Sequence, residues 1–232
     1  MTGRKPGDHM SVTARELAKI LNLSPSAVSI ALNNKPGVST ATRKRVLEAA
    51  YNYGYDLERL HKKFSGSGPI CSVIYKKHGA VVGETAFFQE LFNGIEEECK
   101  KTKYKLSTRY VSEFEGQLEK QIEDIQYAGY AGIIVLGTEM NSDDIQRFQN
   151  LPIPVVLLDS YFEDTYCNCV VINNAQGAFM AASHLIKTTG RQPGYLQSSY
   201  QIGNFLERST GFFNAVRANG MAIGGSPVHQ LT

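Results

Sequence analysis

The chain has 232 residues, of which 42% are hydrophobic and 20% charged, a composition typical of a globular protein with a sizeable core. It contains no run of about 18 apolar residues and no apolar stretch behind its N-terminal basic residues, which argues against a membrane span and a secretory signal. We therefore expect a cytoplasmic protein. Four irregularly spaced cysteines predict reduced thiols rather than a disulfide framework; they are Cys71, Cys99, Cys167 and Cys169.

The charge is unevenly distributed along the chain. Residues 1–68 contain 11 Lys and Arg against 5 Asp and Glu, a net charge of +6, whereas residues 69–232 carry a net charge of −4. A basic head on an acidic body is typical of a nucleic-acid-binding module attached to a regulatory or catalytic body. From charge alone, a solvated basic face without a partner is an equally good interpretation.

Residues 11–58 are predicted to form an all-helical head, after a tag remnant or disordered arm over residues 1–10. Thr13 and Glu16 have the spacing of a capping box, and apolar residues at helical spacing follow them. Asn22 suits a tight turn because Asn tolerates the left-handed conformation. Two short helices joined by such a turn predict a helix-turn-helix.

A third helix is predicted over residues 43–51. The whole segment ELAKILNLSPSAVSIALNNKPGVSTATRKRVLEAAYNYGY resembles the DNA-binding head of the lactose-repressor (LacI) family of transcription regulators. Asn22 stands where that family usually has Gly. The resemblance implies that the second helix enters the major groove and that its N-terminal side chains meet base edges.

The same resemblance implies which head residues contact double-stranded DNA. Pro25 and Ile30 have no polar side-chain group, so they would recognise bases by apolar contact or by shape. Phosphate contacts would position the head without specifying sequence. For each Ser or Thr, an ordinary helix cap is the alternative. The implied base-contacting residues are Ser24, Pro25, Ser26, Ser29 and Ile30, and the implied phosphate-contacting residues are Asn33, Ser39, Thr42, Arg43 and Tyr55.

Residues 59–68 occupy the position of the family's hinge. In the family a hinge helix inserts a Leu side chain into the minor groove and bends the duplex. Phe64 takes that place here, and the Ala-rich sequence usual before it is replaced by basic residues. A flexible basic linker that ends in Ser65–Gly68 is the equally weighted alternative.

From residue 69 onward, apolar strands alternate with amphipathic helices, which predicts an α/β body with parallel sheets covered on both faces. The predicted first lobe spans residues 69–174, and a partial second lobe spans 175–232. The fold class is therefore mixed. Strands are expected at 70–75, 104–111, 132–137, 154–160, 169–174, 194–197 and 228–231, and helices at 87–102, 115–127, 142–149, 175–188 and 205–218.

The segments VVINNAQGAFMAASHLIKTTGRQPGYL and ERSTGFFNAV resemble the periplasmic-binding-protein-like effector domain of the same family. The resemblance implies a small effector, expected to be a sugar, bound between the two lobes by polar groups and an aromatic ring. The alternatives are a core position for Phe88 and a surface salt bridge for Arg208. Asn173 replaces the family's customary Asp. The implied effector-binding residues are Phe88, Asp159, Asn173, Asn204 and Arg208.

The predicted function is a DNA-binding transcription regulator, most simply a repressor, acting as a homodimer on a palindromic operator. Family members continue for roughly another hundred residues beyond the position of Thr232, so the second lobe is expected to be incomplete. The alternative is a truncated ligand-binding or dimerisation module without effective operator control. The sequence contains no P-loop, GxSxG, HExxH or paired-Cys metal spacing, so no enzyme, metal or cofactor is predicted.

Overall fold

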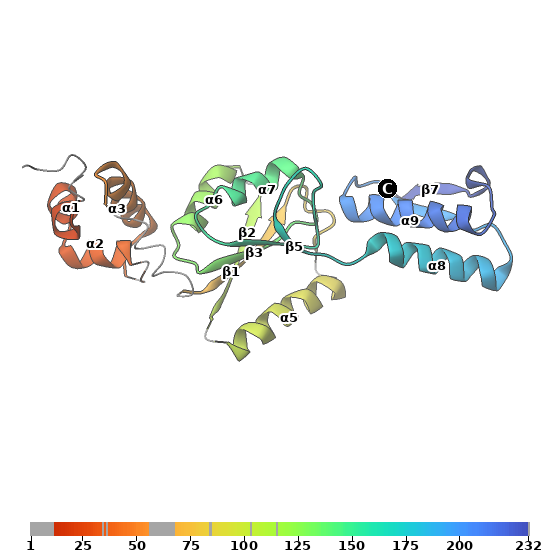
Figure 1. Ribbon diagram of the computed structural model, residues 1–232, viewed down its shortest axis with the longest axis horizontal. Helices are drawn as coiled ribbons and strands as arrows, with labels where there is room; N and C mark the ends of the chain where they lie inside the picture. Colours follow the sequence, from red (N-terminus) through yellow and green to blue (C-terminus); the bar gives the residue numbers. More distant parts are fainter. Residues whose placement is uncertain are drawn as a thin grey trace, which may run out of the picture.

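The computed structural model describes residues 12–33, 35, 37–55, 68–83, 85–102, 104–114 and 116–231. Figure 1 shows a helical head, an α/β first lobe and a smaller second lobe, in a row along the longest axis of the molecule. This is the mixed architecture that the sequence predicts. Within the described ranges, no helix is both long enough and apolar enough to cross a membrane. The predictions for residues 1–10 and for Phe64 concern positions outside these ranges.

Three helices form the head: α1 (Ala14–Leu21), α2 (Pro25–Leu32) and α3 (Thr40–Asn52). Apolar side chains from all three pack into one small core. The helix α3 begins before the predicted residue 43, because the side chain of Ser39 caps its first turn. The head is therefore a helix-turn-helix with a supporting third helix, as expected.

Local capping signals determine where the first head helix begins and ends. The Thr13 hydroxyl accepts a hydrogen bond from the Glu16 backbone N–H at 3.3 Å, and Glu16 accepts one from the Thr13 N–H at 2.7 Å. Asn22 ends the helix with φ 53°, in the left-handed region. Both features confirm the predicted capping box and turn.

The first lobe contains one five-stranded sheet in which every neighbouring pair is parallel. Its spatial order is β2-β1-β3-β4-β5, so the chain crosses over between strands, as parallel pairing requires. The carboxyl ends of the strands therefore lie along one edge of the sheet. The strands are β1 (Ile70–Lys76), β2 (Leu106–Ser112), β3 (Gly132–Leu136), β4 (Val155–Leu158) and β5 (Asn168–Val170).

Helices cover both faces of this sheet (Figure 1): α6 (Leu118–Gln126) and α7 (Ser142–Gln149) lie on one side and α5 (Ala86–Lys101) on the other. The larger core lies under α6 and α7. A smaller core on the opposite face joins Phe88 of α5 to Leu136 of β3. The alternation of strand side chains between two cores explains the continuous apolar strands in the sequence.

The second lobe has a two-stranded parallel sheet, β6-β7, with two long helices beside it. These helices lie side by side in Figure 1, and Gly211 makes this close approach possible. A Cβ atom at Gly211 would lie 2.0 Å from the carbonyl oxygen of Ala175. The elements are α8 (Asn174–Thr189), β6 (Tyr195–Ser198), α9 (Gly203–Ala218), a 3-10 turn η1 (Ile223–Gly225) and β7 (Val228–Leu231).

Two strands, β4 and β5, end at least two residues before their predicted ends. The strand β4 ends at Leu158 rather than residue 160, because Asp159 has φ 63° and leaves the extended conformation. The strand β5 ends at Val170 rather than residue 174, because Asn173 already caps the following helix. The polar residues Asp159 and Asn173 thus follow the carboxyl ends of the two shortened strands.

Candidate functional site

The start of α2 presents a row of small polar side chains to solvent. Ser24, Pro25, Ser26 and Ser29 are all exposed, and Pro25 occupies the first helical position. The Ser24 hydroxyl caps the helix by accepting the Ala27 N–H at 3.1 Å. The ordinary capping role therefore applies to Ser24, while the neighbouring exposed surface is free to face a duplex.

The other end of α2 is held by its own side chains. The Asn33 amide donates to the Ser29 carbonyl oxygen at 2.7 Å and lies 3.2 Å from the Ser29 hydroxyl. Ile30, between them, is half-buried. Base contact by Ile30 and phosphate contact by Asn33 stay predictions.

The side chain of Arg43 is held inside the head. Only 4% of this residue is exposed, and its guanidinium donates to the carbonyl oxygens of Ala31 at 3.1 Å and Lys35 at 2.6 Å. Burial lowers the pKa of Arg43. These contacts join α3 to the end of α2, and phosphate contact by Arg43 stays a prediction.

The remaining predicted phosphate contacts lie at the two ends of α3. Ser39 caps the helix through the Thr42 N–H at 3.1 Å, and the two hydroxyl oxygens are 2.9 Å apart. Tyr55 is half-buried against the head core. Their geometry is that of ordinary caps and packing, and DNA contact by these three residues stays a prediction.

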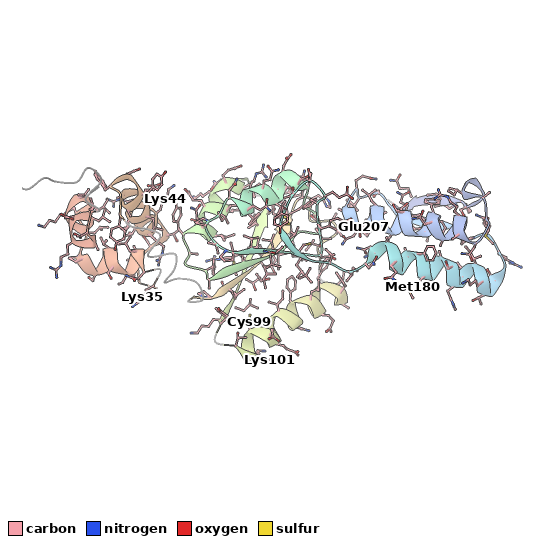
Figure 2. All side chains as sticks on the ribbon, in the orientation of Figure 1. Lys35, Lys44, Cys99, Lys101, Met180 and Glu207 are labelled. Carbon is pink, nitrogen blue, oxygen red and sulfur yellow. The ribbon has the colours of Figure 1, made fainter. Side chains whose placement is uncertain are left out.

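One ion pair joins the head to the first lobe. Lys44 of α3 pairs with Glu123 of α6, and Figure 2 shows Lys44 on the side of the head that faces this lobe. Hydrogen bonding to Glu123 raises the pKa of Lys44. The side chains are 36% and 40% exposed, so the pair is in contact with solvent and open to competition by other charges.

Asp159 forms the centre of a polar cluster between the two lobes. It is 4% exposed, and its carboxylate accepts a hydrogen bond from the Thr138 hydroxyl at 2.7 Å. Burial raises the pKa of Asp159 above its ordinary value. A hydrogen bond from Asn204 and the charge of Arg208 act in the opposite direction and do not offset burial. The structure thus brings together three residues that the sequence assigns to effector binding.

A second set of contacts orients Arg208 within the cluster. Its Nε donates to the Asn174 side-chain oxygen at 2.8 Å, and the Asn174 amide donates to Glu207 at 3.1 Å. The guanidinium also lies over the Phe205 ring, 5.6 Å from its centroid. Figure 2 places Glu207 at the end of α9 nearest the first lobe. Arg208 is therefore positioned by neighbours on two helices rather than by a simple surface salt bridge.

Two predicted effector residues have other roles. Phe88 is 5% exposed and packs with Ile74, Val82 and Leu136 in the smaller core of the first lobe, which supports the core alternative. Asn173 is exposed and caps α8 by accepting a hydrogen bond from the Gln176 N–H at 2.9 Å. Neither side chain belongs to the polar cluster in the described contacts.

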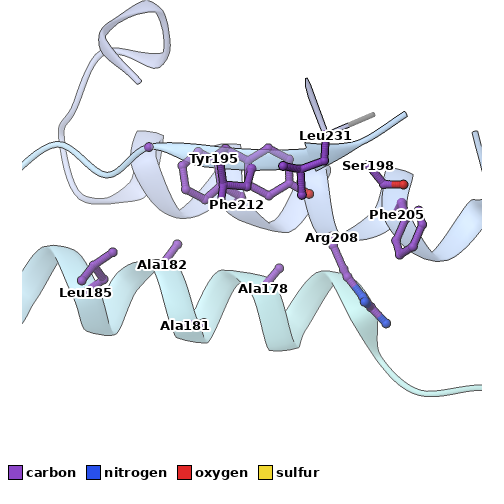
Figure 3. A pocket seen from close by; sticks show the side chains of 12 residues that line it. Ala178, Ala181, Ala182, Leu185, Tyr195, Ser198, Phe205, Arg208, Phe212 and Leu231 are labelled. Carbon is purple, nitrogen blue, oxygen red and sulfur yellow. The ribbon is translucent and has the colours of Figure 1, made fainter. Parts of the chain in front are cut away.

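An apolar hollow of about 650 Å³ lies inside the second lobe, next to this cluster. Figure 3 shows small side chains of α8 on one side and the rings of Tyr195 and Phe212 on the other, with Arg208 extending toward the start of α8. Arg208 is the one predicted effector residue that lines it. The hollow and the Asp159 cluster are thus neighbouring features that share one side chain.

Three residues of the polar cluster were not predicted from the sequence: Thr138, Asn174 and Glu207. Thr138 follows β3 and Asp159 follows β4, so the rule that ligands bind at the carboxyl ends of parallel strands pointed to both. Glu207 directly precedes Arg208 on α9. Asn174 gave no comparable signal, because its hydrogen bonds depend on the crossing of α8 and α9.

A helix-turn-helix head followed by two α/β lobes is the architecture of a transcription regulator with a periplasmic-binding-protein-like body. Residues 70–231 match the family described as periplasmic binding proteins and sugar binding domain of LacI family, and the chain belongs to this family. An HTH-type transcriptional repressor PurR of Aliivibrio salmonicida is 25% identical over 210 residues, which cover 88% of this chain and 60% of the repressor. The chain thus spans about 60% of the length of this relative.

Solved structures share the fold. A transcriptional regulator CelR–cellobiose complex is 17% identical, with a TM-score of 0.61, and the match covers 94% of this chain and 65% of the regulator. The lac repressor dimer bound to operator and the anti-inducer ONPF is also 17% identical, with a TM-score of 0.55 and coverage of 94% and 64%. The titles of both structures name transcription regulators.

Proposed function

We propose that the chain is a sequence-specific DNA-binding repressor whose affinity for its operator is controlled by a small carbohydrate bound between the lobes. One observation carries the proposal. A single chain combines an exposed α2 surface on a helix-turn-helix with a polar cluster in which Asp159 of the first lobe meets Asn204 and Arg208 of the second. The relatives named above, a repressor and two regulator structures with bound small molecules, support the same combination.

The chemistry of the cluster suits a ligand rich in hydroxyl groups. A carboxylate accepts hydrogen bonds, a guanidinium donates them in a fixed geometry, and an amide such as that of Asn204 does both. The Phe205 ring beside Arg208 adds an apolar face. A sugar offers hydroxyls for the first three groups and C–H surface for the ring.

Control would operate as a population shift. A ligand that binds both lobes stabilises one relative position of the lobes over another, and the linked heads change their spacing. Two heads related by two-fold symmetry require a palindromic DNA site, so the proposal includes a homodimer. The competing proposal is a ligand-binding or dimerisation module without effective operator control.

DNA recognition is tested by selecting duplexes from a random pool with the full chain and measuring affinity at several salt concentrations. Ser26→Glu places a negative charge on the proposed DNA surface and should weaken binding to the selected duplex by at least about tenfold. Gln146→Glu adds the same charge to the exposed surface of α7 and should leave binding unchanged. Equal binding to selected and unrelated DNA would favour the competing proposal, a module without effective operator control.

Effector control is tested with a panel of monosaccharides and disaccharides, by thermal shift and by the change in affinity for the selected duplex. Arg208→Gln should abolish the response to any active sugar. Arg217→Gln, on the exposed side of the same helix, is the matched control and should retain it. A sugar response that persists in Arg208→Gln would remove the Asp159 cluster as the effector site.

A further inference from the structure

The loop between β1 and α5 is fastened to its own lobe by one buried carboxylate. Glu139 is 3% exposed, and its two oxygens accept hydrogen bonds from five backbone N–H groups of this loop. Burial acts to raise its pKa, but the donated hydrogen bonds outweigh burial and hold the pKa below its ordinary value. The donors to Oε2 are Lys77 at 2.9 Å, His78 at 3.0 Å and Gly79 at 2.8 Å, and those to Oε1 are Val81 at 2.8 Å and Val82 at 2.9 Å.

An aromatic contact joins the anchored loop to the other lobe. The ring of His78 stacks on the ring of Tyr200, with centroids 4.9 Å apart and an angle of 20° between the planes. Tyr200 lies in the loop between β6 and α9 of the second lobe. The His78 side chain is 31% exposed and Tyr200 is 41% exposed, so the pair lies at the surface of the junction rather than in a core.

The stacked pair and the polar cluster are linked on both sides of the junction. In the first lobe, consecutive residues serve the two features: Thr138 donates to Asp159, and Glu139 holds the backbone of His78. In the second lobe, Tyr200 precedes by four residues Asn204, whose side chain hydrogen-bonds Asp159. The stacked pair and the Asp159 cluster therefore join the same two lobes through residues that are close in sequence on each side.

We propose that His78 and Tyr200 form a latch that favours the relative position of the two lobes found in this structure, which we call the closed position, and that Glu139 is the positioning residue that holds its first-lobe half. The effect of this latch on effector binding rests on the proposed function, but the latch itself exists without any ligand. Aromatic pairs of this kind contribute enough to shift the ratio of closed to open molecules by about two- to tenfold.

The absence of tryptophan from the sequence provides a direct probe. Tyr200→Trp gives the full chain a single indole at the latch, and its accessibility is measured by acrylamide quenching without ligand. Adding His78→Ala, or Glu139→Gln, should raise the quenching constant. Adding His184→Ala, which removes an exposed histidine on α8, is the matched control and should not change it. An unchanged constant in both latch variants would overturn the proposal.

Folding and the proposed function are checked separately. Far-UV circular dichroism shows whether each variant is folded. Tyr200→Phe retains a ring for stacking, so its ratio of closed to open molecules should match that of the unmodified chain. A pair of labels, one on each lobe, measures this ratio. Loss of the closed state in Tyr200→Phe would contradict a stacking latch. If quenching depends on His78 but no sugar binds, the proposed effector function fails and the latch stands. If a sugar binds but the quenching constant does not depend on His78, the latch proposal fails and the proposed effector function stands.

Discussion

The two lobes follow the same alternation of strands and helices but differ in how much apolar surface they bury. In the first lobe, five parallel strands are covered on both faces, and Tyr75 and Phe148 are fully buried. In the second lobe, two strands and two long helices enclose one small core, and Leu196 is 66% exposed on β6. Apolar strand residues thus become core only where a helix or a further strand covers them.

The comparison also extends to polar groups. The first lobe satisfies its buried carboxylates internally: Glu139 binds five backbone N–H groups, and Asp144 pairs with Lys77 at 2.8 Å. Asp159 accepts a hydrogen bond from Thr138 of the first lobe and also interacts with Asn204 and Arg208 of the second. Of these three carboxylates, Asp159 is the one whose partners lie in both lobes.

The largest expected effect tests the core of the first lobe. Phe148→Ala removes a fully buried ring that packs edge-on against Tyr75, with centroids 6.3 Å apart, and should cost about 3–5 kcal/mol of unfolding free energy. Hydrogen exchange of β1 and β3 amides measures it. Phe114→Ala, at a position 74% exposed, should cost little. Equal losses in the two variants would show that the first-lobe core is not close-packed.

Gly211→Ala is the corresponding change in the second lobe. The added Cβ meets the Ala175 backbone, so α8 and α9 must separate, at a cost of about 3 kcal/mol. Hydrogen exchange should accelerate in α8 and α9 and remain unchanged in the first lobe. Gly177→Ala, which meets no atom within 4 Å, should instead stabilise α8 slightly. Faster hydrogen exchange in both lobes would contradict the expectation that the substitution affects the second lobe alone.

Asp159→Asn tests the cost of the charge at the junction. The folded pKa of Asp159 is raised, so the stability contributed by its protonated form is present below its ordinary pKa and is lost as the pH rises through the folded pKa. The charged group therefore destabilises the protein at pH 7. Asn keeps a hydrogen-bond acceptor for Thr138 and tolerates φ 63°, so Tm at pH 7 should rise by about 1–3 °C. A lower Tm would show that the carboxylate is stabilising.

The smallest expected effect concerns the contact between the first lobe and the head. Glu123→Gln removes the partner of Lys44 and frees this cation for phosphate, so affinity for the selected duplex should rise a few-fold at low salt. Glu119→Gln makes the same charge change at another exposed position of α6 and should have no such effect. Identical affinities for the two variants at all salt concentrations would mean that the ion pair does not compete with DNA.

Features that depend on neighbouring residues could be predicted from the sequence, whereas features that depend on distant residues could not. The capping box at Thr13, the turn at Asn22 and the order of strands and helices depend on neighbouring residues, and these predictions are confirmed. The contacts of Arg43 and Phe88 depend on groups that are distant in the sequence or on the opposite side of a sheet. The sequence did not predict the carbonyl partners of Arg43, and it left the core and effector interpretations of Phe88 open. Sequence pattern located the junction cluster through strand ends but could not supply its partners on α8.

The most direct test of the account compares a selected palindromic duplex with a duplex that contains only one of its half-sites. The account predicts cooperative binding of two chains to the palindrome, at least about 100-fold tighter than to the half-site, with a footprint symmetric about its centre. Equal affinity for the two duplexes, lost together as salt is raised, would show that the heads bind DNA singly through charge alone and would contradict the account.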